Sequence, residues 1–402
     1  MNELTLDRVY QAAHVLKPVI NKTELVHATR IDAGCDLYLK AENLQNTGSF
    51  KIRGAYYKIS TLSPEEKTKG VVACSAGNHA QGVALAAQRA GIKSTIFLPA
   101  IAPISKVEAT KSFGAEVRMI DGVYDDAYAA SVAYQKESGA VFIHPFDDID
   151  VIAGQGTIGM EICDQLADAD AVVVPIGGGG LISGVSFVVK KLNPNCKVYG
   201  VQAEGAPSMA EAIKNKKIEP LKTVHTFADG ISVKCPGDVT YDMVSKYVDE
   251  IVTVTDDETA AAILTLMEKQ KVVSEGAGAV SVAAVLFNKI PVAGKKVVCV
   301  VSGGNIDVNI LSRVINRGLI KTGRKADLTL ELLDKPGQLE EVSHIVASMG
   351  ANVTKVDHNS ISMGTDINGC YLTLQMETRN FEHIEAIRQK FVEEGFKLIN
   401  RP

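Results

Sequence analysis

The stretch Asn46-Thr47-Gly48-Ser49-Phe50-Lys51-Ile52-Arg53-Gly54 places one lysine directly after residues that favour a turn and a helix N-cap. In the first turn of a helix, Lys51 would lie at the positive end of the helix dipole, which disfavours its charge. Burial beside the apolar Phe50 and Ile52 would lower the pKa of the amine further. A neutral lysine amine is a nucleophile that forms Schiff bases with carbonyl groups. Taken alone, a lysine is far more often a solvated surface charge.

The chain has 402 residues, a length that predicts two or three domains. Its net charge of −5 is spread without a basic run, so we expect neither nucleic-acid nor anionic-membrane binding. No apolar run reaches transmembrane length, and the N-terminus lacks the apolar core of a signal peptide. The seven cysteines are scattered and include no C-x-x-C pair, which indicates reduced thiols rather than a disulfide framework or a zinc site. We therefore expect a soluble, cytoplasmic protein.

Short β-branched runs alternate with helical patterns from residue 70 onward. The predicted strands are 70–74, 95–99, 116–120, 140–143, 171–175, 197–201 and 296–301. This alternation predicts parallel sheets with helices on both faces. We therefore expect two doubly wound α/β domains, with the cleft between them as the default place for a site.

The last part of the chain, after a charged linker at 321–325, has a different order of predicted strands and helices. A strand with alternating leucines at 328–332 is followed by a helix, two strands, a second helix and a short strand. This β-α-β-β-α-β order predicts a ferredoxin-like module. The expected division is a large domain of 1–66 and 146–320, a small domain of 67–145, and the module at 324–402.

Three loops follow predicted strands and contain residues suited to binding. Four glycines at 177–180 follow one strand and open a helix, so their N–H groups could hold a phosphate, although a tight turn would look the same. Ser75-Ala76-Gly77-Asn78-His79 could hold a carboxylate or a ring oxygen, or it could be only a capped helix start. Ser302-Gly303-Gly304-Asn305 is the third loop, where Ser302 could be a turn hydroxyl.

A fourth glycine motif, Gly154-Gln155-Gly156-Thr157-Ile158-Gly159, has the G-x-G-x-x-G spacing of dinucleotide-binding folds. Its context does not fit, because the acidic stretch at 147–150 separates it from the nearest predicted strand. We interpret it as the N-terminal segment of a helix, and we do not expect nicotinamide chemistry.

The chain resembles the fold-type II pyridoxal-phosphate enzymes in four motifs and in their order. These motifs are the Lys51 stretch, the Ser75 loop, the glycine loop with Leu181, and the Ser302 loop. This is the tryptophan synthase β-like fold, and the motifs are most similar to those of the threonine/serine dehydratase family. The resemblance spans residues 1 to 320. The tail, with Asp334-Lys335-Pro336-Gly337-Gln338-Leu339, resembles an ACT domain, the amino-acid-sensing module of regulated biosynthetic enzymes.

The resemblance implies a role for each matching residue. Lys51 would hold pyridoxal 5'-phosphate and act as the catalytic base, and Phe50 would pack against the cofactor ring. Asn78 would bind the ring oxygen, and Ser302 would contact the ring nitrogen. The phosphate would lie on Gly177, Gly178, Gly179, Gly180 and Leu181, and the substrate carboxylate would lie on Ser75, Ala76, Asn78 and His79.

Two departures from related racemases narrow the expected chemistry. Ala76 stands where those enzymes have a serine that acts as the acid and base on the opposite face, so dehydration is favoured over racemisation. Glu204 matches one carboxylate of their divalent-metal site, but Ala210 stands where a second would be expected, so we expect no bound metal.

The resemblance therefore implies β-elimination of L-threonine to 2-oxobutanoate and ammonia, and of L-serine to pyruvate. The tail would bind a branched-chain amino-acid effector near Pro336, Gly337, Gln338 and Leu339 at a subunit interface of a dimer or tetramer, as suits isoleucine biosynthesis. An oligomerisation module without a ligand is the alternative for the tail. The rival functions are a serine dehydratase or racemase, a β-replacing synthase, and a non-catalytic amino-acid sensor.

Overall fold

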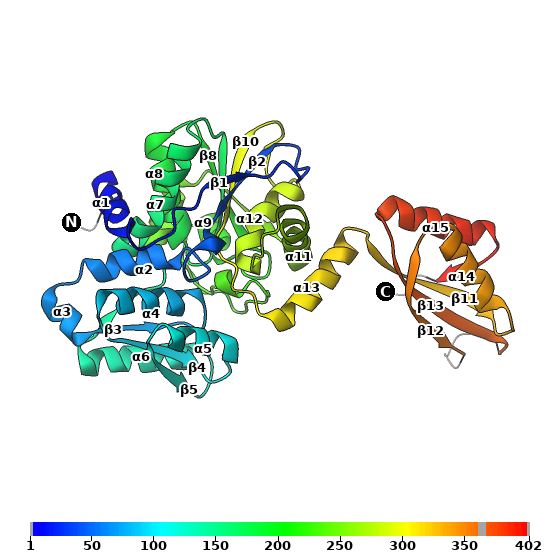
Figure 1. Ribbon diagram of the computed structural model, residues 1–402, viewed down its shortest axis with the longest axis horizontal. Coiled ribbons are helices and arrows are strands. Elements are labelled where there is room, and N and C mark those ends of the chain that lie inside the picture. Colours follow the sequence, from blue (N-terminus) through cyan, green and yellow to red (C-terminus); the bar gives the residue numbers. More distant parts are fainter. Residues whose placement is uncertain (1–2, 361–366, 400–402) are drawn as a thin grey trace. The chain divides into compact units, whose positions relative to one another are not determined.

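A computed structural model describes residues 3–360 and 367–399 (Figure 1). The chain divides into two compact units, Met1–Leu311 and Ser312–Pro402. The division falls inside helix α13, Val308–Lys321, ahead of the charged stretch at 321–325. The described part of the first unit has two sheets and that of the second has one. The further division of the first unit into a large and a small domain stays a proposal.

The larger sheet of the first unit has the strand order β1-β2-β10-β7-β8-β9, and only β1 runs antiparallel to its neighbour. Its strands are β1 Leu25–His27, β2 Asp36–Ala41, β7 Ala171–Pro175, β8 Lys197–Ala203, β9 Glu250–Val254 and β10 Lys296–Val301. Every residue of β7 is buried, as expected for a strand covered on both faces. Because β7 and β10 are parallel neighbours, the loops that follow them leave the sheet at the same edge.

The smaller sheet of the first unit is fully parallel, with the order β5-β4-β3-β6. Its strands are β3 Val71–Cys74, β4 Ser94–Pro99, β5 Glu116–Ile120 and β6 Val141–Phe142. Alternate residues of β3 enter two different cores: Val71 and Ala73 pack with the alanines of α4, while Val72 and Cys74 pack with α6. The sheet is therefore covered on both faces, which confirms the doubly wound arrangement.

The helices of the first unit connect and cover these strands (Figure 1). They are α1 Leu6–Leu16, α2 Lys51–Ser60, α3 Pro64–Lys69, α4 Asn78–Ala90, α5 Ile104–Ser112, α6 Tyr124–Ser138, α7 Ile149–Gln165, α8 Gly180–Leu192, α9 Ser208–Asn215, α10 Asp238–Tyr247, α11 Asp256–Thr265 and α12 Gly276–Leu286. Short turns of other helix types are η1 Glu42–Leu44, η2 Asp229–Ile231 and η3 Leu266–Gln270.

The G-x-G-x-x-G motif was interpreted as the N-terminal segment of a helix. In the structure it lies inside α7, which begins at Ile149, five residues before Gly154. Its glycines serve packing. A Cβ on Gly156 would lie 3.2 Å from the carbonyl oxygen of Gly184 on α8, and one on Gly159 would lie 2.9 Å from that of Val185. The motif lets two helices approach closely.

The second unit has an antiparallel sheet in the order β12-β13-β11-β14. Its elements are β11 Lys325–Leu333, α14 Gln338–Ser348, β12 Asn352–Asn359, β13 Gly369–Glu377, α15 Phe381–Glu393 and β14 Lys397–Ile399. Leu328, Leu330 and Leu332 alternate into a core that they share with α14 and α15. The predicted β-α-β-β-α-β order is confirmed.

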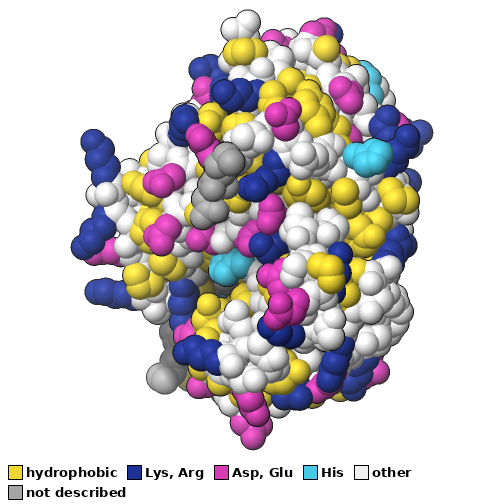
Figure 2. Space-filling model, turned by 90° about the vertical axis from the view of Figure 1, so that its left-hand side faces the viewer, with side chains coloured by type: hydrophobic (Ala, Val, Ile, Leu, Met, Phe, Trp, Pro, Cys, Tyr) yellow, Lys and Arg dark blue, Asp and Glu magenta, His cyan; other side chains and the backbone are white. Residues whose placement is uncertain are grey.

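The surface carries charged side chains of both signs. Figure 2 shows Lys and Arg mixed with Asp and Glu across one face, without a large area of either sign. Among the described residues, no helix combines the length and the apolar character that crossing a bilayer requires.

Candidate active site

Lys51 is the first residue of α2, as predicted, but no side chain caps this helix. Its N-cap is Phe50, and the preceding loop is held by backbone bonds to the loop after β10: Phe50 N donates to Ser302 O at 3.1 Å, and Gly304 N donates to Gly48 O at 2.9 Å. Tertiary pairing therefore replaces the local cap that the polar residues 46–49 suggested. It also ties the start of α2 to the carboxyl end of β10.

The Lys51 amine is buried, which lowers its pKa toward the neutral range. Its Nζ donates to the carbonyl oxygen of Pro145 at 2.8 Å and lies 5.3 Å from the centroid of the Phe50 ring. Burial lowers the pKa of Lys51 to about 8, and the nearby carboxylate of Glu275 opposes part of that change. The expected lowering of the Lys51 pKa is thus confirmed.

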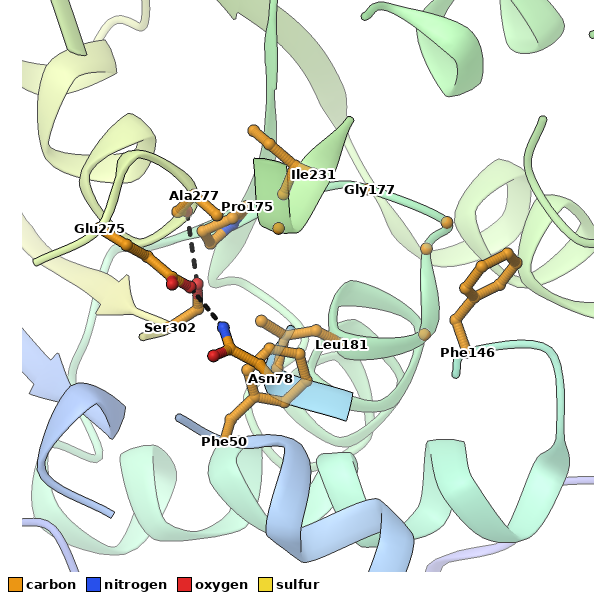
Figure 3. A pocket seen from close by; sticks show the side chains of 14 residues that line it. Phe50, Asn78, Phe146, Pro175, Gly177, Leu181, Ile231, Glu275, Ala277 and Ser302 are labelled. Carbon is orange, nitrogen blue, oxygen red and sulfur yellow. Dashed lines mark hydrogen bonds between the residues drawn. The ribbon is translucent and has the colours of Figure 1, made fainter. Parts of the chain in front are cut away.

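A pocket brings together residues from the three predicted loops (Figure 3). Phe50, the residue before Lys51, lines it, whereas Lys51, Ser75, Ala76 and His79 are not among its lining residues. The pocket is lined by the predicted Phe50, Asn78, Gly177, Gly178, Gly179, Gly180, Leu181 and Ser302, and also by Phe146, Pro175, Gly230, Ile231, Glu275 and Ala277. These residues come from both sheets of the first unit, since Asn78 follows β3 while the glycine loop and Ser302 follow β7 and β10. The pocket therefore lies at the carboxyl ends of parallel strands.

The glycine loop has the shape of an anion cradle. A Cβ on Gly178 would lie 2.4 Å from a ring carbon of Phe146, and Gly179 has a φ of +98°, so side chains are excluded here. Thr240 Oγ1 donates to the carbonyl oxygen of Gly178 at 2.7 Å, which turns the N–H of the same peptide, that of Gly179, away from Thr240. The loop ends at the start of α8, where the first N–H groups have no partner within the helix.

Asn78 is held on both sides of its amide. Its Nδ2 donates to Glu275 Oε1 at 2.6 Å, and its Oδ1 accepts from Asn305 Nδ2 at 2.7 Å. The second hydrogen of Nδ2 remains for a ligand oxygen. Figure 3 shows Asn78 and Glu275 pointing toward one another, with Phe50 below them.

Sequence reasoning missed Glu275, which is buried at the N-cap position of α12, where its side chain makes no cap hydrogen bond. Burial and the charge of Asp229 raise the pKa of Glu275 to about 7. A usable signal was present in Ser274-Glu275-Gly276-Ala277-Gly278, where an acidic residue stands beside two glycines at a helix start.

Replacing Glu275 with glutamine is expected to make stability less dependent on pH. The ordinary pKa of 4.5 is raised to about 7 in the fold, so the folded chain keeps a proton that the unfolded chain has released between these values. Stability is therefore lost as pH rises through this window. Glu275→Gln keeps the acceptor for Asn78 and should gain about 3 kcal/mol at pH 8 but little at pH 4.5. Urea unfolding at both pH values measures this, with the exposed Glu211→Gln as control; an equal gain at both would contradict it.

The residues predicted to hold a substrate lie around the start of α4. Ser75 Oγ accepts from Gly77 N at 3.1 Å, and Ala76 lies between them. The ring of His79 is buried and engaged, because its Nε2 lies 2.7 Å from Ile143 O. Burial and the charge of Lys51 lower the pKa of His79 to about 3, so this ring is neutral. Ser75, Asn78 and backbone N–H groups of the loop can therefore bind a ligand, whereas the His79 ring has a structural role.

The residues present fit pyridoxal phosphate. The bare glycine loop suits a phosphate, the spare Asn78 hydrogen suits a ring oxygen, and the amine of Lys51 suits an aldehyde. Parallel sheets with this lysine and this loop define a fold-type II pyridoxal-phosphate enzyme.

Comparison with known proteins agrees. A family profile described as "Pyridoxal-phosphate dependent enzyme" matches residues 16–303, and the chain belongs to this family. It is 51% identical to an L-threonine ammonia-lyase of Thermotoga maritima over 397 residues, which are 98% of this chain and 99% of that relative.

Two solved structures are similar to most of this chain. One is the processed form of threonine deaminase isoform 2 from Solanum lycopersicum, with a TM-score of 0.73 and 37% identity over 79% of this chain and 95% of that one. The other is maize serine racemase, with a TM-score of 0.74 and 36% identity over 79% of this chain and 98% of that one.

Proposed function

We propose that this chain is an L-threonine ammonia-lyase that converts L-threonine to 2-oxobutanoate and ammonia, and also acts on L-serine. The observation that carries the proposal is the Lys51 amine, with its lowered pKa, beside a pocket that ends in a bare glycine loop. The full-length similarity to an L-threonine ammonia-lyase supports the choice of substrate.

Lys51 has two roles in this reaction: its Nζ holds the cofactor, and the same atom removes the Cα proton of the substrate. With a pKa of about 8, roughly one amine in ten is neutral at pH 7, against fewer than one in a thousand at the ordinary 10.5. When bound, pyridoxal phosphate supplies the electron sink that makes the Cα proton acidic. Loss of that proton and of the β-hydroxyl gives an enamine, which water converts to the 2-oxo acid and ammonia.

The other residues bind and orient. The glycine loop holds the phosphate, and Asn78 donates to the ring oxygen with its amide fixed by Asn305 and Glu275. Ser75 and the start of α4 bind the substrate carboxylate, which aligns the Cα proton with Lys51. Ser302 offers a neutral hydroxyl to the ring nitrogen. An uncharged partner there leaves a weaker electron sink than an aspartate would, which suits elimination.

Because the chain is also similar to a serine racemase, its proposed function has to be distinguished from racemisation. We propose that Ala76, which has no hydroxyl, disfavours racemisation. We expect Ala76→Ser to raise racemisation of L-serine about tenfold or more, because it adds a hydroxyl that can return a proton. Chiral chromatography of the remaining serine measures this, with Ala100→Ser at an exposed position as control. No increase would remove Ala76 as the determinant.

The second unit is proposed to bind a branched-chain amino acid and thereby regulate the reaction. Pro336 and Gly337 form the turn before α14, Gly337 has a φ of +92°, and Leu339 is half exposed. An effector acts by binding two states of the enzyme with different affinity. We propose that the effector lies between subunits of a dimer or tetramer and that the enzyme serves isoleucine biosynthesis. The seven unpaired cysteines support a cytoplasmic location.

One assay tests the function: 2-oxo acid release from L-threonine and L-serine, with and without isoleucine and valine. Product and ammonia without an added nucleophile support the lyase and argue against a β-replacing synthase. If the protein binds amino acids but forms no product from either substrate, the non-catalytic amino-acid sensor is favoured. A rate that none of the amino acids changes would favour an oligomerisation role for the second unit.

A further inference from the structure

Three potential metal ligands meet at one end of the sheet in the second unit. They are Asp334 after β11, His358 on β12 and Cys370 on β13, and their ligand atoms lie within 4.8 Å of one another. Among the residues that the structure describes, this is the group of three such side chains with metal-binding spacing. The site could not be predicted from the sequence, because the three residues are far apart and follow no zinc-site pattern.

The register of the sheet explains why these side chains converge. Cys370 pairs with Leu332 of β11, and His358 of β12 pairs with Leu372 of β13. Paired residues share a face, and so do residues two apart on a strand. Cys370 and Leu372 therefore share the face that packs on the helices, and His358 and Asp334 lie on that face at its edge.

The separation of the histidine and carboxylate ligand atoms suits a tetrahedral ion, and the thiol lies within 4.8 Å of both. His358 Nε2 and Asp334 Oδ1 are 3.6 Å apart, while two ligands bound about 2.1 Å from a tetrahedral zinc ion lie about 3.4 Å apart. The Asp334 backbone is fixed, because its N–H donates to Asn368 O at 2.8 Å. Asp334 and His358 are exposed and Cys370 is buried. An ion can therefore reach the site from solvent and bind the buried thiolate.

We propose that Asp334, His358 and Cys370 bind one divalent transition-metal ion of the zinc class, separate from the pocket at Lys51. A thiolate, an imidazole and a carboxylate together favour such an ion over Mg²⁺ or Ca²⁺, which take oxygen ligands. Binding displaces the thiol proton of Cys370 to solvent, and a water completes the fourth position. The site stabilises the turn that leads into α14.

Titration of the full chain with Co²⁺, after treatment with a chelator, tests the proposal. We expect one ion per chain, with visible absorption and a sulfur-to-cobalt band seen as a difference from the metal-free protein, and displacement by Zn²⁺. Zn²⁺ should also raise the melting temperature of the second unit. Catalytic activity is not part of the readout, so the result is independent of the proposed function.

Variants at the three ligands give the decisive comparison. His358→Asn and Asp334→Asn replace exposed side chains and should weaken Co²⁺ binding about tenfold or more, while Cys370→Ser should remove the sulfur band. His344→Asn, on the exposed face of α14, and Cys235→Ser, in the first unit, should bind as the unaltered chain does. No binding, or binding that His358→Asn and Asp334→Asn leave unchanged, would overturn the proposal and leave a simple polar contact between Asp334 and His358.

Discussion

Lys51→Ala is expected to lower the rate of 2-oxobutanoate formation by about a thousandfold or more and to remove the visible absorption of the bound cofactor. The variant loses the Nζ that we propose both holds the cofactor and takes the Cα proton, so both proposed roles would fail together. The pKa of about 8 makes the neutral amine available for both. Turnover at saturating threonine and an absorption spectrum of the purified protein measure the two losses separately.

Lys69→Ala serves as the matched control, because that exposed lysine only pairs with Glu65 one helical turn away. It should keep both the spectrum and the rate. Full activity of Lys51→Ala would disprove the assigned chemistry. A Lys51→Ala protein that keeps the cofactor absorption and still turns over threonine would assign the base to another group, and turnover without that absorption would contradict both roles of Lys51.

The pocket was largely predictable from sequence because its residues stand in loops directly after β-branched strands. The glycine loop and Ser302 each follow such a strand, and parallel strands bring those loops to one edge. Glu275 was not predictable in this way. Its partner Asn78 lies 197 residues earlier, and nothing local pairs the two.

Strand β2 was missed for a different reason. Its sequence, Asp36 to Ala41, includes Lys40 and is followed by Glu42, and charged residues of this kind normally indicate a surface. In the structure both side chains are buried, because ion pairs within the core satisfy them. Hydrophobic patterns cannot reveal a buried charge whose partners come from distant segments.

These charges form one buried ion-pair network, and Arg53 joins it to the helix that begins at Lys51. Arg53, two residues after Lys51, donates through Nε to Glu42 Oε2 at 2.8 Å and through Nη1 to Glu161 Oε1 at 2.7 Å. Lys40 Nζ donates to Glu161 Oε2 at 2.6 Å. The two carboxylates raise the pKa of Arg53 above its ordinary value, and Arg53 lowers that of Glu42. The network joins α2 to η1 and α7, so it fixes the first turn of the helix that carries Lys51.

Arg53→Met is therefore expected to destabilise the first unit by about 3 to 5 kcal/mol at pH 8, because it leaves the carboxylate of Glu42 buried without its main partner. In the unaltered chain the lowered pKa of Glu42 contributes stability above the unfolded value, which is lost as pH falls. In the variant, burial favours the protonated form of Glu42. The loss of stability relative to the unaltered chain should therefore become smaller as the pH falls toward 4. Calorimetry of the first unit's unfolding measures this.

The comparison variants decide whether charge or packing is responsible. Arg30→Met replaces an exposed arginine and should cost less than about 1 kcal/mol at any pH. Adding Glu42→Gln to Arg53→Met should recover part of the loss at pH 8, since it removes the unpaired charge and keeps the shape. A deficit that is equal at pH 4 and pH 8, and that Glu42→Gln does not reduce, would mean that Arg53 acts through packing alone. In that case the position of Lys51 would depend on helix contacts rather than on this network of buried charges.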